Sequence, residues 1–199
     1  DFLYDTLCGF TFKLSVPSFY QVNPDQAEVL YDRVLELAGL TGEQTVLDLY
    51  CGIGTITLVL ARRAGKAIGA EVIPAAIEDA KANAARNGIE GMEFLVADVF
   101  ALLEELGGQK KSPYDFIILD PPAFTKSAAT ARSAFRGYKE INYRAMKLLP
   151  RGGYLATCSC SHFATEELFI KMLRSAAKDA HRQLRQIEVR QQAPDHPIL

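Results

Sequence analysis

The sequence predicts an α/β fold built on a doubly wound, mostly parallel sheet. Short apolar runs of strand length alternate with amphipathic segments of helix length along the chain. Strands buried on both faces read as continuous apolar runs, as residues 116–119 do. Several runs end on a carboxylate or a glycine loop, and open α/β sheets bind their ligands at that edge. A ligand site at the carboxyl edge of the sheet is therefore expected.

The elements can be assigned in chain order from their punctuation. Residues 3–14 fit a short hairpin. A helix follows, because Asn23 is a good N-cap, Pro24 suits the first helical position and Gly39 ends the pattern. Later helices are expected over about 56–63, 74–87, 99–107, 138–149 and 165–182. Strands are expected in "TVLDLY", "AIGAEV", "EFLVAD", "YDFIILD", "YLATCSC" and "LRQIEVRQQ".

Length and composition suit one globular domain over residues 1–199, with residues 1–22 as an extension and residues 23–199 as the core. The chain is 49% hydrophobic with a formal net charge of −2, which gives no overall sign of nucleic-acid binding. No run approaches the roughly 18 apolar residues of a membrane span, and no signal peptide is visible. The cysteines form no CxxC pair. We expect a cytoplasmic protein that does not bind a membrane.

The segment "LDLYCGIGT", residues 47–55, lies at a turn from strand to helix. Gly52 and Gly54 let a ligand approach the backbone, and the helix start offers free N–H groups. Glu71 ends the next strand, where an acid would bind a ribose diol. A nicotinamide site shares these features, so they do not settle the ligand.

Three residues favour a different ligand. Thr57 stands where a dinucleotide site has its third glycine. Asp48 would crowd a pyrophosphate but suits a cationic group, and Asp98 could accept a hydrogen bond from an adenine amino group. A ligand with adenine, ribose and ammonium but no phosphate is S-adenosylmethionine. For Asp48 and Asp98 taken singly, ordinary loop capping stays an alternative.

Asp120 is followed by Pro121 and Pro122 in "DFIILDPPAFTKS". The prolines cannot donate to a sheet ladder, so the strand must end at about Asp120. This leaves a carboxylate and a rigid loop at the carboxyl edge. Adenine-N6 enzymes use a similar loop for an exocyclic amine, so the loop alone does not identify the substrate.

The two halves of the chain resemble two related families. "SFYQVN", "VLDLYCGIGT" and "GAEVIPAAIEDAKANAARNGIE" closely resemble the methyltransferase domain of RNA uracil-5-methyltransferases. "DFIILDPPAFTKS", "RGYKEINYRAMKLLPRGGYLATCSCSHF" and "DHPIL" resemble the large-subunit rRNA cytosine-5-methyltransferases instead. The resemblance changes near residues 90–97, which indicates a natural intermediate or a chimera. It implies a class I S-adenosylmethionine-dependent methyltransferase with a Rossmann-like fold.

The resemblance implies specific roles. It implies cofactor contacts by Gln21, Tyr50, Thr55, Glu71, Asp98 and Asp120. RNA, with rRNA preferred, is the implied partner, although neither family's accessory RNA-binding domain is recognisable. The chain departs from the uracil family in carrying "SCSH" where that family has "SCNP". The glutamate that acts as general base in that family has no match in this chain. It stops before the closing strand of the cytosine family, so the sheet is expected to lack its last strand.

Carbon 5 of a pyrimidine is a poor nucleophile until a thiolate adds to carbon 6. Cys160 aligns with the nucleophile of both families, and its place in a turn would present it to substrate, whereas Cys158 fits the core. A small buried hydrophobe is the alternative role for Cys160. No metal is expected, because the spacing of the cysteines and His162 matches no standard zinc pattern. The expected catalytic pair is Cys160 with Asp120, and the expected substrate contacts are Pro121, Pro122, Phe124, Arg136 and Lys139.

Cytosine in RNA is the preferred target, because the half of the chain that would face the substrate resembles the cytosine family. Uracil methylation is one alternative. A folded cofactor-binding domain without catalysis is the other.

Overall fold

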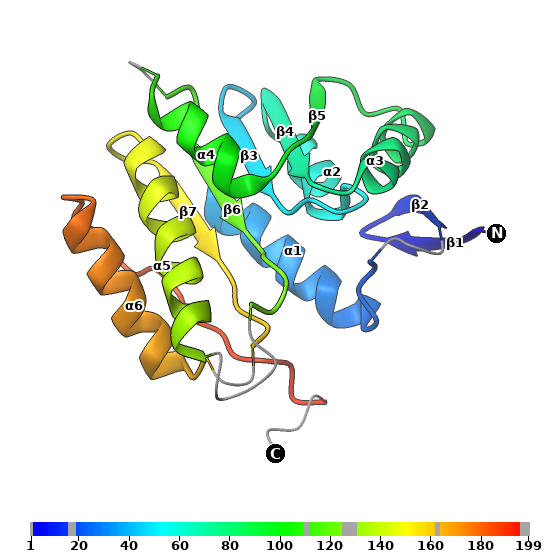
Figure 1. Ribbon diagram of the computed structural model, residues 1–199. Coiled ribbons are helices and arrows are strands. Elements are labelled where there is room, and N and C mark those ends of the chain that lie inside the picture. The colour runs from blue at the N-terminus through cyan, green and yellow to red at the C-terminus, as the bar shows by residue number, and fades with distance from the viewer. Residues whose placement is uncertain (1, 16–18, 110–111, 125–130, 162–163, 196–199) are drawn as a thin grey trace.

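The computed structural model describes residues 2–15, 19–109, 112–124, 131–161 and 164–195. Its centre is a five-stranded sheet in the order β5-β4-β3-β6-β7, with every neighbouring pair parallel (Figure 1). The strands are β3 (Thr45–Leu49), β4 (Lys66–Glu71), β5 (Met92–Val96), β6 (Phe116–Leu119) and β7 (Tyr154–Thr157). The order reverses between β3 and β6. That reversal places the expected ligand crevice at their carboxyl ends.

Helices cover both faces of the sheet (Figure 1). They are α1 (Pro24–Ala38), α2 (Thr55–Ala61), α3 (Pro74–Arg86), α4 (Val99–Gly107), α5 (Ala131–Leu148) and α6 (Glu166–Asp179). The apolar side chains of α1, α2 and α3 form one core layer with the sheet, while α4 and α5 form the second. α6 packs against α5. No helix in the described part of the chain is long and apolar enough to cross a membrane.

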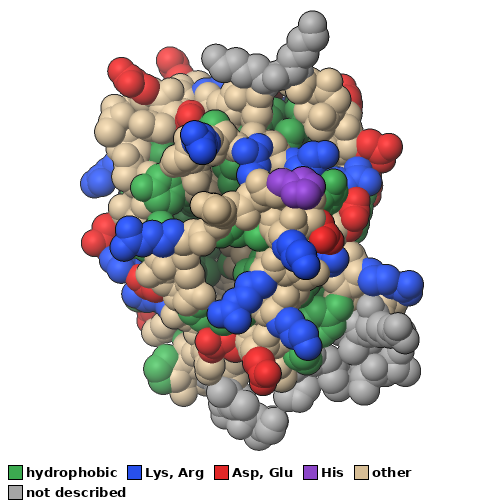
Figure 2. Space-filling model, turned by 90° about the vertical axis from the view of Figure 1, so that its left-hand side faces the viewer, with side chains coloured by type: hydrophobic (Ala, Val, Ile, Leu, Met, Phe, Trp, Pro, Cys, Tyr) green, Lys and Arg blue, Asp and Glu red, His purple; other side chains and the backbone are tan. Residues whose placement is uncertain are grey.

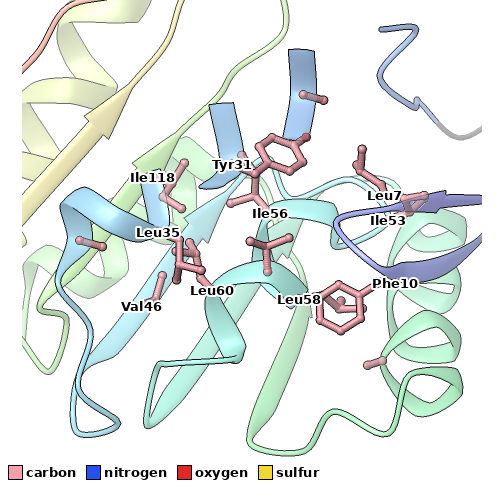
Figure 3. Packing of buried hydrophobic residues seen from close by; sticks show 14 of the residues in the cluster. Leu7, Phe10, Tyr31, Leu35, Val46, Ile53, Ile56, Leu58, Leu60 and Ile118 are labelled. Carbon is pink, nitrogen blue, oxygen red and sulfur yellow. The ribbon is translucent and has the colours of Figure 1, made fainter. Parts of the chain in front are cut away.

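The predicted hairpin is present as β1 (Phe2–Leu7) and β2 (Phe10–Ser15). Its two-residue turn has positive φ at both positions, 51° at Cys8 and 74° at Gly9, as the right-handed twist of a hairpin favours. Leu7 points from the hairpin into the core beside Ile53 of the glycine loop, and Phe10 lies beside Leu58 of α2 (Figure 3). The hairpin is therefore anchored on the helical layer next to the ligand crevice.

The start of α1 follows the predicted punctuation. The Asn23 side chain accepts a hydrogen bond from the Gln26 amide at 3.2 Å, and Pro24 occupies the first turn. Gly39 ends the helix in the left-handed conformation, with φ 58°. These caps fix where residues 19–22 enter the helix, and so hold that segment at the carboxyl edge of the sheet.

The prediction of a last strand over residues 184–192 is wrong. The segment runs along the molecule without strand pairing, and its apolar side chains are exposed, with Leu184 at 53% and Ile187 at 57%. Instead of a ladder it makes side-chain contacts, such as the ion pair of Glu188 with Arg33 on α1 at 2.5 Å. Within the described residues β7 is therefore an edge strand. α5 also begins seven residues before the predicted start at 138, at Ala131.

Candidate active site

A cleft opens at the carboxyl edge of the sheet between the ends of β3 and β6. It encloses about 430 Å³ of empty space, part of it open to solvent. Six residues predicted to contact a cofactor line it: Gln21, Asp48, Tyr50, Gly52, Thr55 and Asp120. The other lining residues are Phe19, Tyr20, Tyr31, Cys51, Ile53 and Ile56.

The glycine loop is tied to the end of β4. The Gly52 amide donates to the Glu71 carboxylate at 3.3 Å, and the Val72 amide donates to the same side chain at 2.8 Å. Gly52 has a φ of 54°, and a Cβ added there would meet no atom within 4 Å. Gly54 has a φ of 83°, and a Cβ there would press on Phe94 at 3.2 Å. The two glycines thus leave room in front of the loop and let it pack closely behind.

Asp48 and Asp120 give the cleft its charge. Asp48 is only 2% exposed and accepts a hydrogen bond from the Thr57 hydroxyl at 2.6 Å. Burial raises the pKa of Asp48 to about 7, and the negative charge of Asp120 adds to the rise against the opposing Thr57 hydrogen bond. Burial also raises the pKa of Asp120 above its usual range. No Lys or Arg is among the described residues that line the cleft, so it favours a cationic ligand.

Tyr50 lies near the acids that end β4 and precede α4. Burial raises the pKa of its hydroxyl, and the negative charges of Asp98 and Glu71 raise it further, which places these three side chains in one region. Within the described chain the Tyr50 hydroxyl is buried without a hydrogen-bond partner. Asp98 also caps α4 by accepting from the Ala101 amide at 3.0 Å. Asp98 therefore caps helix α4, which was the alternative role for this residue.

Sequence reasoning missed Tyr31. It extends from α1 into the cleft, is 2% exposed, and its hydroxyl lies 3.2 Å from the Thr55 hydroxyl oxygen. Burial raises the pKa of Tyr31, as do the charges of Asp120 and Asp48. The signal was the spacing of Tyr31 four residues after Ala27, on the buried face of the helix.

The two predicted thiols have different surroundings. Cys160 is exposed just past the end of β7, and its thiol donates a hydrogen bond to the Pro121 carbonyl oxygen, with 3.8 Å between sulfur and oxygen. Burial of part of the thiol and the charge of Asp120 raise its pKa. Cys158 extends the strand through its amide, which donates to the Leu119 carbonyl at 2.8 Å, and burial raises its pKa strongly. Cys160 is therefore the thiol open to a substrate.

The predicted substrate contacts are only partly brought together. Pro121 is buried and Pro122 is exposed at the rim beside Asp120. Phe124 packs on Tyr138 of α5, with ring centroids 4.6 Å apart. Lys139 pairs with Asp179 on α6 at 2.6 Å, and Arg136 is exposed on α5. None of these last three side chains lines the cleft.

A family model described as a methyltransferase domain matches residues 40–198. The chain belongs to this methyltransferase family. Membership confirms the predicted class I fold and the predicted cofactor, S-adenosylmethionine.

Curated relatives of the methyltransferase match about three fifths of the chain. An RNA methyltransferase of Halalkalibacterium halodurans is 48% identical over 122 residues, which is 61% of this chain and 26% of the relative. An RNA methyltransferase of Oceanobacillus iheyensis is 46% identical over the same shares. The chain thus spans about a quarter of the length of these relatives.

Solved structures resemble the methyltransferase over most of its length. The tRNA (uracil-54, C5)-methyltransferase of Pyrococcus abyssi, in complex with S-adenosylhomocysteine, has 26% identity and a TM-score of 0.60 over 86% of this chain and 38% of its own. A putative methyltransferase of Streptococcus mutans has 18% identity and a TM-score of 0.71, over 88% of this chain and 46% of its own. The second likeness shows the fold alone.

Proposed function

We propose that this domain transfers a methyl group from S-adenosylmethionine to carbon 5 of a pyrimidine in RNA, with cytosine preferred and Cys160 as covalent nucleophile. The observation that carries the proposal is the exposed Cys160 thiol against the Pro121 carbonyl, beside a carboxylate that lines the cleft. Methylation of an amino group would need no such thiol.

The cleft fits the cofactor in charge and shape. Two carboxyl groups line it, the buried Asp48 and the partly exposed Asp120, without a Lys or Arg among the described lining residues, which suits an ammonium and a sulfonium. The unpartnered Tyr50 hydroxyl and the open space in front of Gly52 provide a hydrogen-bonding group and a backbone cradle. Glu71 and Asp98 would hold ribose and adenine.

The bound cofactor supplies an electrophilic methyl group on a sulfonium sulfur. The Cys160 thiolate adds to carbon 6 of the pyrimidine, which makes carbon 5 nucleophilic enough to take that methyl group. After methyl transfer a base removes the carbon 5 proton, and the Cys160 thiolate leaves as the ring double bond re-forms. Pro121 and Pro122 fix the loop on which the base would rest.

Cytosine is preferred because the second half of the chain, which carries Asp120 and Cys160, resembles the cytosine family. Asp120, whose charge acts on Cys160, would contact the base there. Uracil is the second candidate, favoured by the 26% identity with the Pyrococcus abyssi uracil-54 enzyme. The names of the curated relatives support RNA, with rRNA preferred from the resemblance of the second half of the chain.

The test is a trapping experiment with RNA that contains 5-fluorocytidine or 5-fluorouridine. Fluorine blocks the final proton removal, so the wild type should accumulate a covalent adduct that survives denaturing electrophoresis. Cys160→Ala should form no adduct and transfer no methyl group, while its affinity for S-adenosylhomocysteine stays near wild type in calorimetry. Single-turnover conditions with excess protein keep weak RNA binding from hiding the result.

Cys158→Ala is the matched control. It should keep the adduct and lose about 1 kcal/mol of stability, as expected for a small truncation in the core. An adduct kept by Cys160→Ala and lost by Cys158→Ala would reverse the choice of thiol. If the wild type forms no adduct with either RNA, the non-catalytic alternative stands.

A further inference from the structure

The outer face of the hairpin carries aromatic rings and cations in contact. The rings of Phe2 and Tyr4 are 58% and 49% exposed and meet edge to face, with centroids 5.4 Å apart. The Lys13 ammonium lies 4.9 Å from the Phe2 centroid, and the Arg86 guanidinium lies 4.6 Å from the Tyr4 centroid. Tyr4 and Lys13 are direct partners in the hairpin register, so they share one face. We call Phe2, Tyr4, Lys13 and Arg86 the hairpin platform.

Helix α3 holds the platform rigidly. Asn83 accepts from the Lys13 amide at 2.7 Å, and Asn87 accepts from the Thr11 amide at 2.9 Å. Arg86 lies between these two asparagines in sequence and donates to the Tyr4 hydroxyl at 3.2 Å. Lys13 also lies 4.0 Å from Asp79, which is buried. These contacts hold the backbone of β2, the Lys13 side chain and the Tyr4–Arg86 pair in place before any partner binds, and that lowers the entropy cost of binding.

Aromatic side chains connect the hairpin to the cleft. Phe12, on the inner face of the hairpin, lies 6.5 Å from Tyr20, measured between ring centroids. Tyr20 and Phe19 both line the cleft, and Phe19 is 74% exposed. Phe12 is buried, so the hairpin packs through the core against the segment that lines the cleft, and the Phe19 ring of that segment is exposed.

We propose that the hairpin platform binds single-stranded RNA next to the target base. Aromatic faces stack on bases of any sequence, and Lys and Arg pair with phosphates, so the platform combines the two interactions that hold single strands. The inference rests on RNA as the substrate of the proposed function. The platform and α6 lie on opposite sides of the cleft (Figure 1). Helix α6 also exposes cations, at Lys171 and Arg174, and Figure 2 shows Lys and Arg side chains on that side of the molecule. The α6 side is therefore the alternative RNA-binding surface in the test.

The first experiment measures the affinity of a fluorescein-labelled 12-nucleotide pyrimidine RNA by anisotropy. The double variant Phe2→Ala/Tyr4→Ala should bind it about tenfold or more weakly, from the loss of base stacking. Tyr154→Ala is the matched control, because this 41% exposed tyrosine begins β7 at the amino edge of the sheet. It should bind as the wild type does.

The second experiment measures the salt dependence of the same binding. Lys13→Gln and Arg86→Gln should each lower the slope of log K against log salt by about 0.7, because each removes one phosphate contact to a single strand. Lys66→Gln, at the amino edge of the sheet, should leave the slope unchanged. If Arg174→Gln lowers the slope and Lys13→Gln does not, RNA crosses α6 and the platform proposal is overturned.

The affinity for S-adenosylhomocysteine and the 5-fluoropyrimidine adduct separate the two proposals. Platform variants should bind S-adenosylhomocysteine as the wild type does, and loss of both ligands would show a purely structural role that overturns the inference. Wild-type RNA affinity in these variants, with the Cys160 adduct intact, would overturn the platform and leave the proposed function standing. Absence of any RNA binding by the wild type would overturn both.

Discussion

Asp48 is a carboxyl group that the fold buries almost completely, with the Thr57 hydroxyl as its donor. Because its pKa rises from an ordinary 3.8 to about 7, the native state binds more protons than the unfolded state between these values. The free energy of unfolding should therefore fall as pH rises through this window, by at most about 1.4 kcal/mol per pH unit from this group. Urea denaturation of the wild type and Asp48→Asn from pH 4.5 to 7.5 measures it, and the variant should show a shallower slope.

Thr57→Val provides the complementary variant. Loss of the hydroxyl donor removes the stronger of the two Thr57 hydrogen bonds that favour the ionised carboxyl and leaves the one from the backbone. The pKa of Asp48 should therefore rise, and the loss of stability should extend to higher pH. Equal pH dependence in the wild type and Asp48→Asn would contradict the assignment of the slope to Asp48.

At the scale of elements, Asn83 on α3 and Asn87 at its C-cap take the place of a neighbouring strand for β2. Within the described residues the outer edge of β2 pairs with no strand, and its amides at Thr11 and Lys13 bond instead to Asn87 and Asn83. Both side-chain amides also donate back to the carbonyls of the same two residues. Spacing of four residues puts the asparagines on one helix face, so the helix mimics a neighbouring strand.

Asn83→Ala should lower the free energy of unfolding by about 1–3 kcal/mol, because Asn83 is fully buried and its loss leaves backbone groups of β2 unpaired. Hydrogen exchange of the Lys13 amide should quicken in the same variant. Asn87→Ala is the control: Asn87 is more exposed, so water can replace its bonds and the loss should be smaller. An unprotected Lys13 amide in the wild type would show that the hydrogen bond from Lys13 to Asn83 does not form in solution.

The segment 184–192 shows why strand prediction fails at this end of the chain. Its composition suits a strand, but a strand is stable only where it pairs and buries a face. Here Glu188 pairs with Arg33 and Arg190, and Gln191 donates to Glu166 at 2.7 Å, so side-chain contacts hold the segment in place of a ladder.

At the scale of the molecule, the cleft is lined by residues of α1, β3 and α2 and by Asp120 just after β6, and its glycine loop is bonded to β4. A ligand there binds only the native state, so S-adenosylhomocysteine at 100 times its Kd should raise the free energy of unfolding by about 2.7 kcal/mol. Glu71→Ala should gain much less at the same concentration, since loss of a charged hydrogen-bond partner costs about 1.5–3 kcal/mol of affinity. Denaturation with and without ligand measures both values.

Glu43→Ala is the matched acid control, because Glu43 is exposed in the loop before β3 at the opposite edge of the sheet. S-adenosylhomocysteine should raise the free energy of unfolding of this variant as much as that of the wild type. A full gain in Glu71→Ala would remove Glu71 from the cofactor site. The sheet continues from β4 to β5 without a break near residues 90–97. The change of family resemblance at those residues stays a prediction.

Sequence alone determined the features that depend on local chemistry. The caps of α1, the hairpin over residues 3–14, the apolar strands, and the end of β6 before Pro121 all follow from backbone preferences and burial periodicity. The order of strand and helix then fixed the fold class, and with it the edge that holds the ligand.

Tertiary structure decided what depends on which side chains meet. It placed Tyr31 in the cleft, engaged Lys139 with Asp179, and left residues 184–192 unpaired. It also raised the pKa of Asp48, because desolvation and the charge of Asp120 come from residues far apart in sequence. Periodicity reports whether a side chain is buried, and only packing determines which group it is buried against.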